Sequence, residues 1–240
     1  MALISKDQVV SNKKLLKDYK QQLVSLTDQE FQAALGVMLG DASLQSQDNE
    51  KTYRLKFEQG GEHKDYMDHL YNLFYNWSLS PPREQARINA NGNTVVSWTF
   101  QTFSHTAFVP LADIFFRRKN VESNNVIKSI GDNFVKNHVT PLVLAYWFMD
   151  DGGKMDYGKN QGKGIVFNTH GFEKNEVEAL CLSLSNKFNL ECWAKRNKKK
   201  YIVAISGKSY EQVLFLIKDL VIPSLHNKFP SPRRERQKKS

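Results

Sequence analysis

Two apolar segments, residues 34–42 (ALGVMLGDA) and 144–152 (LAYWFMDDG), stand out along the chain, and each delivers a carboxylate near its C-terminal end. The first follows residues 27–30 (TDQE), whose threonine and glutamate have the spacing of a helical capping box. The second follows residues 140–141 (TP), a capping hydroxyl and a proline suited to the first helical position. The pattern therefore predicts two buried helices, each ending in an acid.

An apolar helix with no polar face must pack against another element, and the simplest partner for each predicted helix is the other. Small residues at Gly36, Gly40 and Ala145 would let the two backbones approach closely. In that arrangement Asp41 and Asp151 meet, and neighbouring carboxylates do not readily ionise together unless a cation lies between them. An oxygen-only site of this kind suits a hard cation such as Mg²⁺.

After the first apolar segment, the pattern predicts strand, strand, helix, strand, strand and helix. Alternation of Tyr53, Leu55 and Phe57 with polar neighbours predicts a half-buried strand. A helix is expected over residues 67–77, and the Asn-Gly pair at residues 91–92 predicts a tight hairpin. Helical spacing marks the last helix of this half, with Phe108, Leu111, Ile114 and Phe115.

The second half repeats this order, which predicts a duplicated unit. Ile165 and Phe167 mark a strand, and residues 177–188 have the apolar spacing of a helix. A hairpin is expected over residues 192–206 and a final helix over residues 213–220.

Polar and basic side chains follow the predicted strands and the second hairpin turn. On the open face of a helix-covered antiparallel sheet they can line a nucleic-acid groove, but a solvated surface gives the same pattern. For one strand the solvated surface is the simpler interpretation, whereas two sheets flanking a shared acid pair favour DNA. The candidate DNA-binding residues are Arg54, Lys56, Arg83, Gln85, Arg87, Asn89, Lys154, Lys195, Arg196, Lys198, Lys199 and Lys200.

These elements divide the chain into two repeats, residues 1–119 and 139–230. The segment between them, residues 120–138, is polar and is expected to be a loop-like linker. Residues 231–240 form a basic tail, expected to be disordered, that either adds affinity for phosphate or is simply solvated.

Composition agrees with a globular protein of 240 residues in one large or two small domains. The formal net charge of +9 favours a polyanionic partner, although charge alone is weak evidence. Cys181 and Cys192 are too few for a disulfide framework, so packed thiols in a reducing, intracellular compartment are expected. No apolar run approaches the length of a membrane span, and no Walker loop, nucleophile elbow or dinucleotide fingerprint is present.

The two apolar segments resemble the paired LAGLIDADG motifs of single-chain homing endonucleases. The resemblance is most specific at residues 144–153 (LAYWFMDDGG), which are similar to the intron-encoded branch typified by the omega-intron endonuclease, and it extends over residues 15–230. Leu39 stands where the motif name has its first Asp, and Tyr146 and Asp150 replace the small residues of the first copy. The helix contact is therefore expected to be asymmetric.

The resemblance implies an α+β fold, a pseudo-twofold tandem repeat of the unit α-β-β-α-β-β-α, with two antiparallel saddle-shaped sheets and helices on their outer faces. It places the metal-binding acids at Asp41 and Asp151, with Asp150 as the alternative to Asp151 and with Gly40 and Asp150 among the candidate metal ligands. It also assigns active-site lysines that follow the last helix of each half, to stabilise charge or organise water. These are Lys128 and Lys228.

Phosphodiester hydrolysis needs an activated water, a cation on the phosphate and help for the departing 3′ oxygen, and this set supplies all three. The resemblance implies a monomer that uses Mg²⁺, with Mn²⁺ substituting, to cut both strands of a long asymmetric DNA target and leave short 3′ overhangs. A mitochondrial location follows if an organelle intron encodes the chain. An intron RNA-splicing maturase and a catalytically silent DNA-binding protein are the alternatives.

Overall fold

The computed structural model of the protein describes residues 3–118, 126–131, 133–155 and 162–231. The chain divides into two compact units, and helix α3 (Asp28–Leu39) contributes to both. The first unit contains the chain up to Ala34 together with Asp41–Phe116, and the second contains Leu35–Gly40 together with the chain from Arg117 onward. The C-terminal part of α3 therefore belongs to the same unit as the second motif helix.

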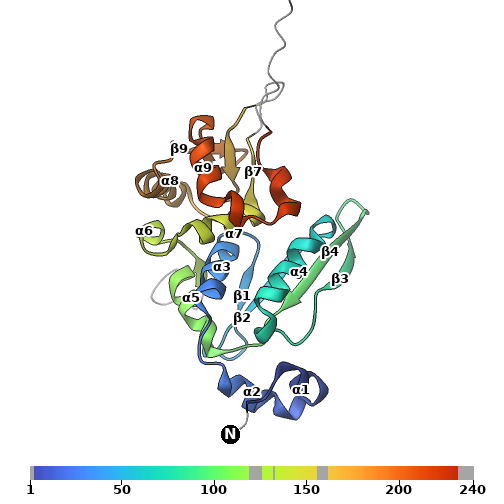
Figure 1. Cartoon of the computed structure of the whole chain (residues 1–240). Coiled ribbons are helices and arrows are strands. Elements are labelled where there is room, and N and C mark those ends of the chain that lie inside the picture. The colour runs from blue at the N-terminus through green and yellow to red at the C-terminus, as the bar shows by residue number, and fades with distance from the viewer. Residues whose placement is uncertain (1–2, 119–125, 132, 156–161, 232–240) are drawn as a thin grey trace, which may run out of the picture. The chain divides into compact units, whose positions relative to one another are not determined.

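In the first unit, strands form an antiparallel sheet in the order β1-β2-β4-β3. Strand β2 alternates between half-exposed and buried side chains, as expected for a strand with one face on a core. Helix α4 packs on β2 and β4 (Figure 1). The elements after α3 are β1 (Ser43–Gln45), β2 (Arg54–Gly60), α4 (Lys64–Leu73), β3 (Arg83–Ile88), β4 (Thr94–Gln101) and α5 (Val109–Phe115).

The core of this unit is aromatic. Phe57 of β2 stacks on Phe100 of β4 with ring centroids 4.4 Å apart, and it also contacts Phe74 after α4 at 5.3 Å. Leu55 and Met67 are fully buried beside them. Burial of each such side chain contributes roughly 1.5–3 kcal/mol, so this cluster fixes the covered face of the sheet.

The second unit has the same element order and the matching strand order β7-β8-β10-β9. Helix α8 packs on β9 and β10. The predicted repeat α-β-β-α-β-β-α and the α+β fold class are therefore confirmed. The elements are α7 (Pro141–Asp151), β7 (Gly152–Lys154), β8 (Ile165–Phe167), α8 (Lys174–Phe188), β9 (Cys192–Asn197), β10 (Lys200–Ile205) and α9 (Tyr210–Ile217).

Helix α7 is the centre of the second core, and its side chains are buried from Val143 to Asp150. The Trp147 ring lies 4.5 Å from that of Phe167, and Phe148 stacks on Phe229 at 4.5 Å. An all-round apolar helix is thus buried all round, as its sequence predicts.

The loop-like linker predicted between the repeats is wrong in part, because the segment contains regular structure. Strand β5 (Phe116–Arg118) pairs with β6 (Val126–Lys128), and helix α6 (Phe134–His138) packs on α8. Phe134 and Val135 are buried. This tertiary contact stabilises a helix too short to be indicated by local periodicity. The exact limits of the repeats stay a prediction.

The first hairpin is present, but its turn is wider than the predicted two-residue turn. Five residues, 89–93, connect β3 to β4, and Gly92 adopts a positive φ of 79° whereas Asn91 does not. The side-chain oxygen of Asn89 accepts hydrogen bonds from the amides of Asn91 and Asn93, each at 3.0 Å. This Asx-type bonding stabilises the longer loop over a type I′ turn.

Helices α1 (Lys6–Ser11) and α2 (Leu16–Gln22) precede α3 in the first unit. In the described part of the chain, no helix is long and apolar enough to cross a bilayer. Of the basic tail predicted at residues 231–240, residues 232–240 lie outside the described residues.

Candidate active site and nucleic-acid interface

Both motif helices begin as the sequence predicts. The amide of Thr27 donates to the Glu30 carboxylate at 2.7 Å, and the Glu30 amide donates back to the Thr27 hydroxyl at 3.2 Å. At the second helix the Thr140 hydroxyl accepts from the amide of Val143 at 3.2 Å. These caps fix where each helix starts.

The C-terminal part of α3 touches α7 backbone to backbone within the second unit. A Cβ atom added at Gly36 would lie 2.5 Å from the Cβ of Tyr146 and 2.6 Å from the carbonyl oxygen of Val143. One added at Gly40 would lie 2.6 Å from a carboxylate oxygen of Asp150. Both glycines are therefore required by close approach, and the contact is asymmetric, as predicted, because Gly36 and Gly40 lie against Tyr146 and Asp150 of α7.

In the first unit, Asp41 lies just after α3 and before β1. Its carboxylate accepts a hydrogen bond of 3.1 Å from the side-chain amide of Gln59, which is only 8% exposed. Gln59 was not among the predicted site residues. The signal was present, since alternation along β2 places this polar side chain on the covered face.

In the second unit, Asp151 is the last residue of α7 and is half-exposed. Its backbone carbonyl accepts from the amide of Asn168, just after β8, at 3.0 Å. Asp150 is only 8% exposed and lies at the contact with Gly40. The two neighbouring acids therefore have different surroundings.

Lys228 approaches the end of α7. Its ammonium group donates hydrogen bonds to the backbone carbonyls of Met149 and of Asp150, the latter at 2.8 Å. The last carbonyls of a helix carry partial negative charge and lack partners within the helix, so a cation there is stabilised. The lysine is thereby held at the backbone of the residue that precedes Asp151.

Lys128 ends strand β6, and its ammonium group lies over the ring of Phe172, 5.6 Å from the centroid. The amide of Phe172 donates to the carbonyl of Thr169 at 3.0 Å, in the turn that follows β8. Asn168 at the start of this turn is bonded to the Asp151 backbone. A short chain of contacts thus connects Lys128 with the end of α7.

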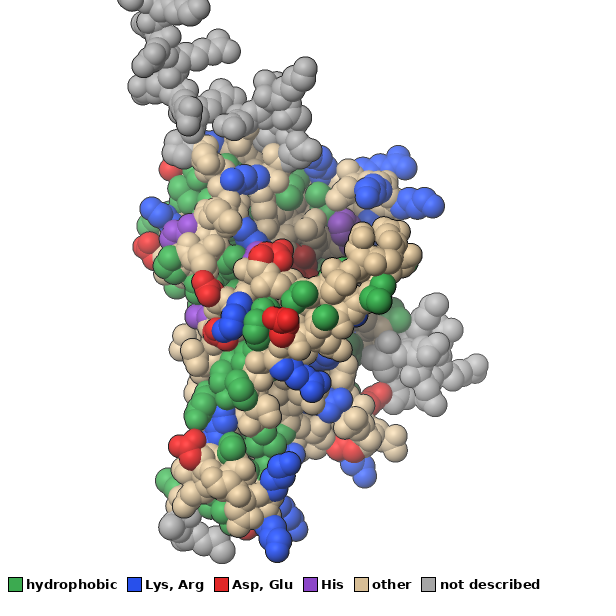
Figure 2. Space-filling view, turned by 90° about the vertical axis from the view of Figure 1, so that its right-hand side faces the viewer, with side chains coloured by type: hydrophobic (Ala, Val, Ile, Leu, Met, Phe, Trp, Pro, Cys, Tyr) green, Lys and Arg blue, Asp and Glu red, His purple; other side chains and the backbone are tan. Residues whose placement is uncertain are grey.

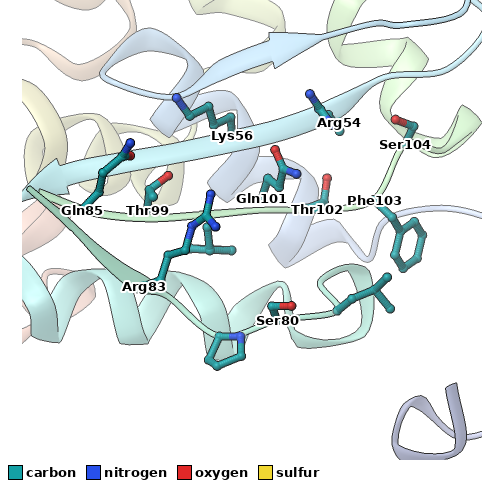
Figure 3. A pocket seen from close by; sticks show the side chains of 13 residues that line it. Arg54, Lys56, Ser80, Arg83, Gln85, Thr99, Gln101, Thr102, Phe103 and Ser104 are labelled. Atoms are coloured by element: carbon teal, nitrogen blue, oxygen red, sulfur yellow. The ribbon is translucent and has the colours of Figure 1, made fainter. Parts of the chain in front are cut away.

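The open face of the first sheet forms a polar cleft (Figure 3). The strand register aligns Lys56 with Gln101 and Arg83 with Thr99, so these side chains share one face. Arg54 donates to the side chain of Gln45 at 3.2 Å on the same face. The cleft is lined mainly by Arg54, Lys56, Arg83, Gln85, Thr99 and Gln101.

The remaining candidates on this sheet have partners within the protein. Arg87 forms an ion pair with Glu58. Asn89 lies one residue beyond β3, and its side-chain oxygen is used by the hairpin turn. Asn89 therefore belongs to the hairpin turn and not to the strand face that carries Arg83 and Gln85.

On the second sheet, two of the predicted DNA-binding residues, Lys154 and Arg196, do not lie on the open face. The register pairs Lys154 with Ile165, which lies two residues from Phe167 and therefore on the same face of the sheet. The Phe167 ring contacts Trp147 of α7, so this is the helix-covered face. Arg196 pairs with Tyr201, on the face of Phe167, and donates to the Lys198 carbonyl at 3.2 Å. Both basic residues are exposed at the margin of the helix-covered face, because successive strand residues point to opposite faces.

The open face of the second sheet carries Lys195 and Lys200, with the turn residues Lys198 and Lys199 between the strands. Lys198 has a left-handed φ of 54°. Trp193, which was not predicted to be functional, lies on this open face with Val166 and Ala204 and is 41% exposed. An exposed tryptophan on a strand is the signal that could have identified it.

The N-terminal helices add further basic side chains that were not among the candidates, visible at the lower end of the view in Figure 2. Within the first unit, the Lys20 ammonium group donates to the carbonyl of Ser104, a residue that lines the cleft, at 3.0 Å. Three further lysines of the same N-terminal segment are exposed: Lys13, Lys14 and Lys17.

Comparison with known proteins agrees with this architecture. The model of the LAGLIDADG DNA endonuclease family matches residues 31–213. The chain belongs to this family. A probable intron-encoded endonuclease 1 of Wickerhamomyces canadensis is 40% identical over 218 residues, covering 90% of each chain. A cytochrome b mRNA maturase bI2 of Debaryomyces hansenii is 31% identical over 198 residues, covering 80% of this chain and 70% of the relative.

Among solved structures, the homing endonuclease I-WcaI bound to its DNA recognition sequence matches this LAGLIDADG chain with a TM-score of 0.85 and 38% identity. The match covers 95% of this chain and 98% of that one. LAGLIDADG endonucleases generally use divalent metal ions. Within the described residues, no cluster of three or more His, Cys, Asp and Glu side chains is arranged to hold a metal ion by itself.

Proposed function

We propose that this protein is a site-specific DNA homing endonuclease that cuts both strands of a long asymmetric target, leaving short 3′ overhangs. The observation that carries the proposal is the duplicated unit whose motif helices meet at Gly36 and Gly40 and each lead into an acid. The similarity to I-WcaI, which is bound to its DNA in the solved structure, supports the same partner here. One chain supplies both halves, so the protein acts as a monomer.

The DNA duplex is proposed to lie on the open faces of the sheets. Arginine and glutamine can each make paired hydrogen bonds with guanine or adenine in the major groove, so Arg83 and Gln85 are suited to base readout. Lysines of the second hairpin, together with those of η1 (Lys13–Leu15) and α2, are suited to phosphate contacts. Phosphate contacts make affinity strongly dependent on salt.

The carboxylates of Asp41 and Asp151 are proposed to hold Mg²⁺, which Mn²⁺ can replace. The donor set fits, because Mg²⁺ is usually bound by one or two carboxylates and completes its shell with water and substrate phosphate. The Gly40 carbonyl is a further oxygen ligand, whereas burial of Asp150 at the helix contact favours Asp151 as the acid of the second motif. When bound, the ion would stabilise negative charge on the phosphate.

The protein's own groups have separate roles in this scheme. Gln59 orients the Asp41 carboxylate, and the Asn168 amide holds the backbone at Asp151. Lys228 and Lys128 supply positive charge near the attacking water or the departing 3′ oxygen. Because each lysine follows the last helix of its own repeat, each is proposed to serve mainly one strand.

A splicing maturase is the second candidate, favoured by the relative from Debaryomyces hansenii. Retention of both motif acids favours the nuclease. Intron-encoded relatives also make a mitochondrial location the natural expectation.

The decisive experiment incubates the protein with supercoiled plasmid carrying a candidate intron-insertion site, with and without Mg²⁺. The expected result is Mg²⁺-dependent linearisation, abolished in Asp41→Asn and Asp151→Asn although both still bind DNA. Asp150→Asn is the matched control and should lose much less activity. Full cleavage by either of the first two variants would refute the shared-metal site, and binding to intron RNA without any cleavage would favour the maturase.

A further inference from the structure

The Glu176 carboxylate occupies an unusual position between the segment after Lys128 and the start of α8. One of its oxygens accepts hydrogen bonds from the Ser129 hydroxyl at 2.8 Å and from the Ile130 amide at 3.0 Å. The other oxygen accepts from the Glu173 amide at 2.8 Å, within the capping box of the helix. A single carboxylate therefore ties the backbone next to Lys128 to a helix more than forty residues away in the chain.

The same helix start also contacts the Lys128 side chain. Phe172, two positions before the first residue of α8, is almost completely buried, and its ring lies beneath the Lys128 ammonium group. The Phe172 amide is in turn fixed to Thr169. The beginning of α8 thus contacts Lys128 twice, through its backbone neighbours and through its charged end.

We infer that Glu176 is a positioning residue for Lys128, and that it controls cleavage of the one DNA strand that Lys128 serves. This inference rests on the proposed function. Lysine has a long flexible stem, and a charge placed 1 Å away from its productive position loses much of its effect on the transition state. Two charge-assisted hydrogen bonds to residues 129 and 130 remove the backbone part of that freedom.

Glu176 is not itself a group that touches substrate, because both of its oxygens are occupied by donors from the protein. Lys228 is held by backbone carbonyls at the end of α7. The two lysines are therefore positioned by different elements, and loss of Glu176 should affect them unequally.

The test uses the full-length protein on a target duplex with each strand separately labelled, at saturating enzyme. Glu176→Ala should slow the strand slowed by Lys128→Met by about 10- to 100-fold. The other strand should change by less than about twofold, with DNA affinity unchanged. Adding Glu176→Ala to Lys128→Met should slow that strand no further, because the lysine that Glu176 positions is already absent. Glu176→Gln, which keeps an acceptor oxygen, should recover most of the rate.

Two controls separate positioning from stability. Glu178→Ala removes a surface carboxylate on the same helix that pairs with Lys174 at 3.2 Å, and should leave both strand rates unchanged. Ser129→Ala removes one of the two hydrogen bonds and should give a smaller, same-strand effect.

Equal slowing of both strands by Glu176→Ala, full additivity with Lys128→Met, or wild-type rates in folded Glu176→Ala would each overturn the inference while leaving the nuclease proposal intact. Failure of the wild-type protein to cut any target would overturn both.

Discussion

The two sheets share one strand order but present different open faces. The first carries charged and amide side chains such as Arg54, Lys56 and Gln101, whereas the second combines lysines with the exposed ring of Trp193. Topology is therefore preserved across the repeat while surface chemistry is not. One half is suited to hydrogen bonding with bases, and the other to apolar contacts such as those with thymine methyl groups.

The motif helices show a second difference between the halves. The two glycines at their contact, Gly36 of α3 and Gly40 just after it, lie against Tyr146 and Asp150 of α7. The contact between the two motif helices is therefore built from unlike surfaces.

The largest expected effect comes from placing a side chain where the two glycines now let the motif helices approach. Gly36→Leu or Gly40→Leu should destabilise the protein by at least about 1–3 kcal/mol, since a Cβ atom would meet the Val143 carbonyl at position 36 and the Asp150 Cβ atom at position 40. For a chain of this size that corresponds to a fall in melting temperature of several degrees, accompanied by loss of cleavage.

Gly153→Ala is the matched control, because a Cβ atom there would meet nothing within 4 Å. Thermal unfolding should be nearly unchanged in this variant. Equal melting temperatures for Gly36→Leu and wild type would show that the helices do not meet as described.

The next effect concerns the two lysines. Lys228→Met keeps the apolar stem but removes the charge, and should slow one strand about a hundredfold while nicked circles accumulate. Lys128→Met should slow the opposite strand. Labelled linear duplex measures both rates, and Lys228→Met with wild-type rates on both strands would exclude this residue from the site.

Much of this organisation could be predicted from sequence because it depends on local signals. Capping residues at 27–30 and 140–141 identified both motif helices, and alternation along β2 identified its covered face. Register could not be predicted in the same way. A one-residue difference decides whether Lys195 or Arg196 reaches the open face, and only the pairing with β10 determines it.

Long-range side-chain contacts were the other part that sequence did not predict. Alternation along β2 places Gln59 on the covered face, but neither its contact with Asp41 nor that of Glu176 with residues 129–130 follows from periodicity, because each contact joins segments distant in the chain. Helix α6 was missed for the same reason, since its stability comes from α8.

A moderate effect is expected from the second hairpin. Combining Lys198→Asn, Lys199→Gln and Lys200→Gln removes three charges, and asparagine tolerates the left-handed backbone at position 198. Binding should weaken for every DNA sequence, and the slope of log affinity against log salt should fall by about 0.9 per lost phosphate contact. Changed sequence preference with an unchanged slope would show instead that the turn reads bases.

A finer comparison within one strand tests the assignment of faces. Lys195→Gln should weaken DNA binding more than Arg196→Gln, because Lys195 lies on the open face whereas Arg196 lies on the helix-covered face. Affinity measured at one salt concentration for the two variants decides the matter, and the reverse order would place the DNA on the other side of β9.

The smallest effect reports on the second unit alone, because both cysteines lie in it, on α8 and β9. Burial raises the pKa of Cys181 to about 12 and that of Cys192 to about 11, from an ordinary value of 9.0. At pH 8 the reactive thiolate of Cys192 should therefore be roughly a hundredfold scarcer in the folded protein than in the unfolded chain. Raising the pH above 9 should reduce stability, since the unfolded chain releases thiol protons that the folded protein retains.

Alkylation of the two cysteines, measured by mass spectrometry, should be slow for wild type and faster for Gly36→Ala, which strains the helix contact of this unit. Rapid alkylation of the folded wild-type protein at pH 8 would show that these thiols are not packed as described.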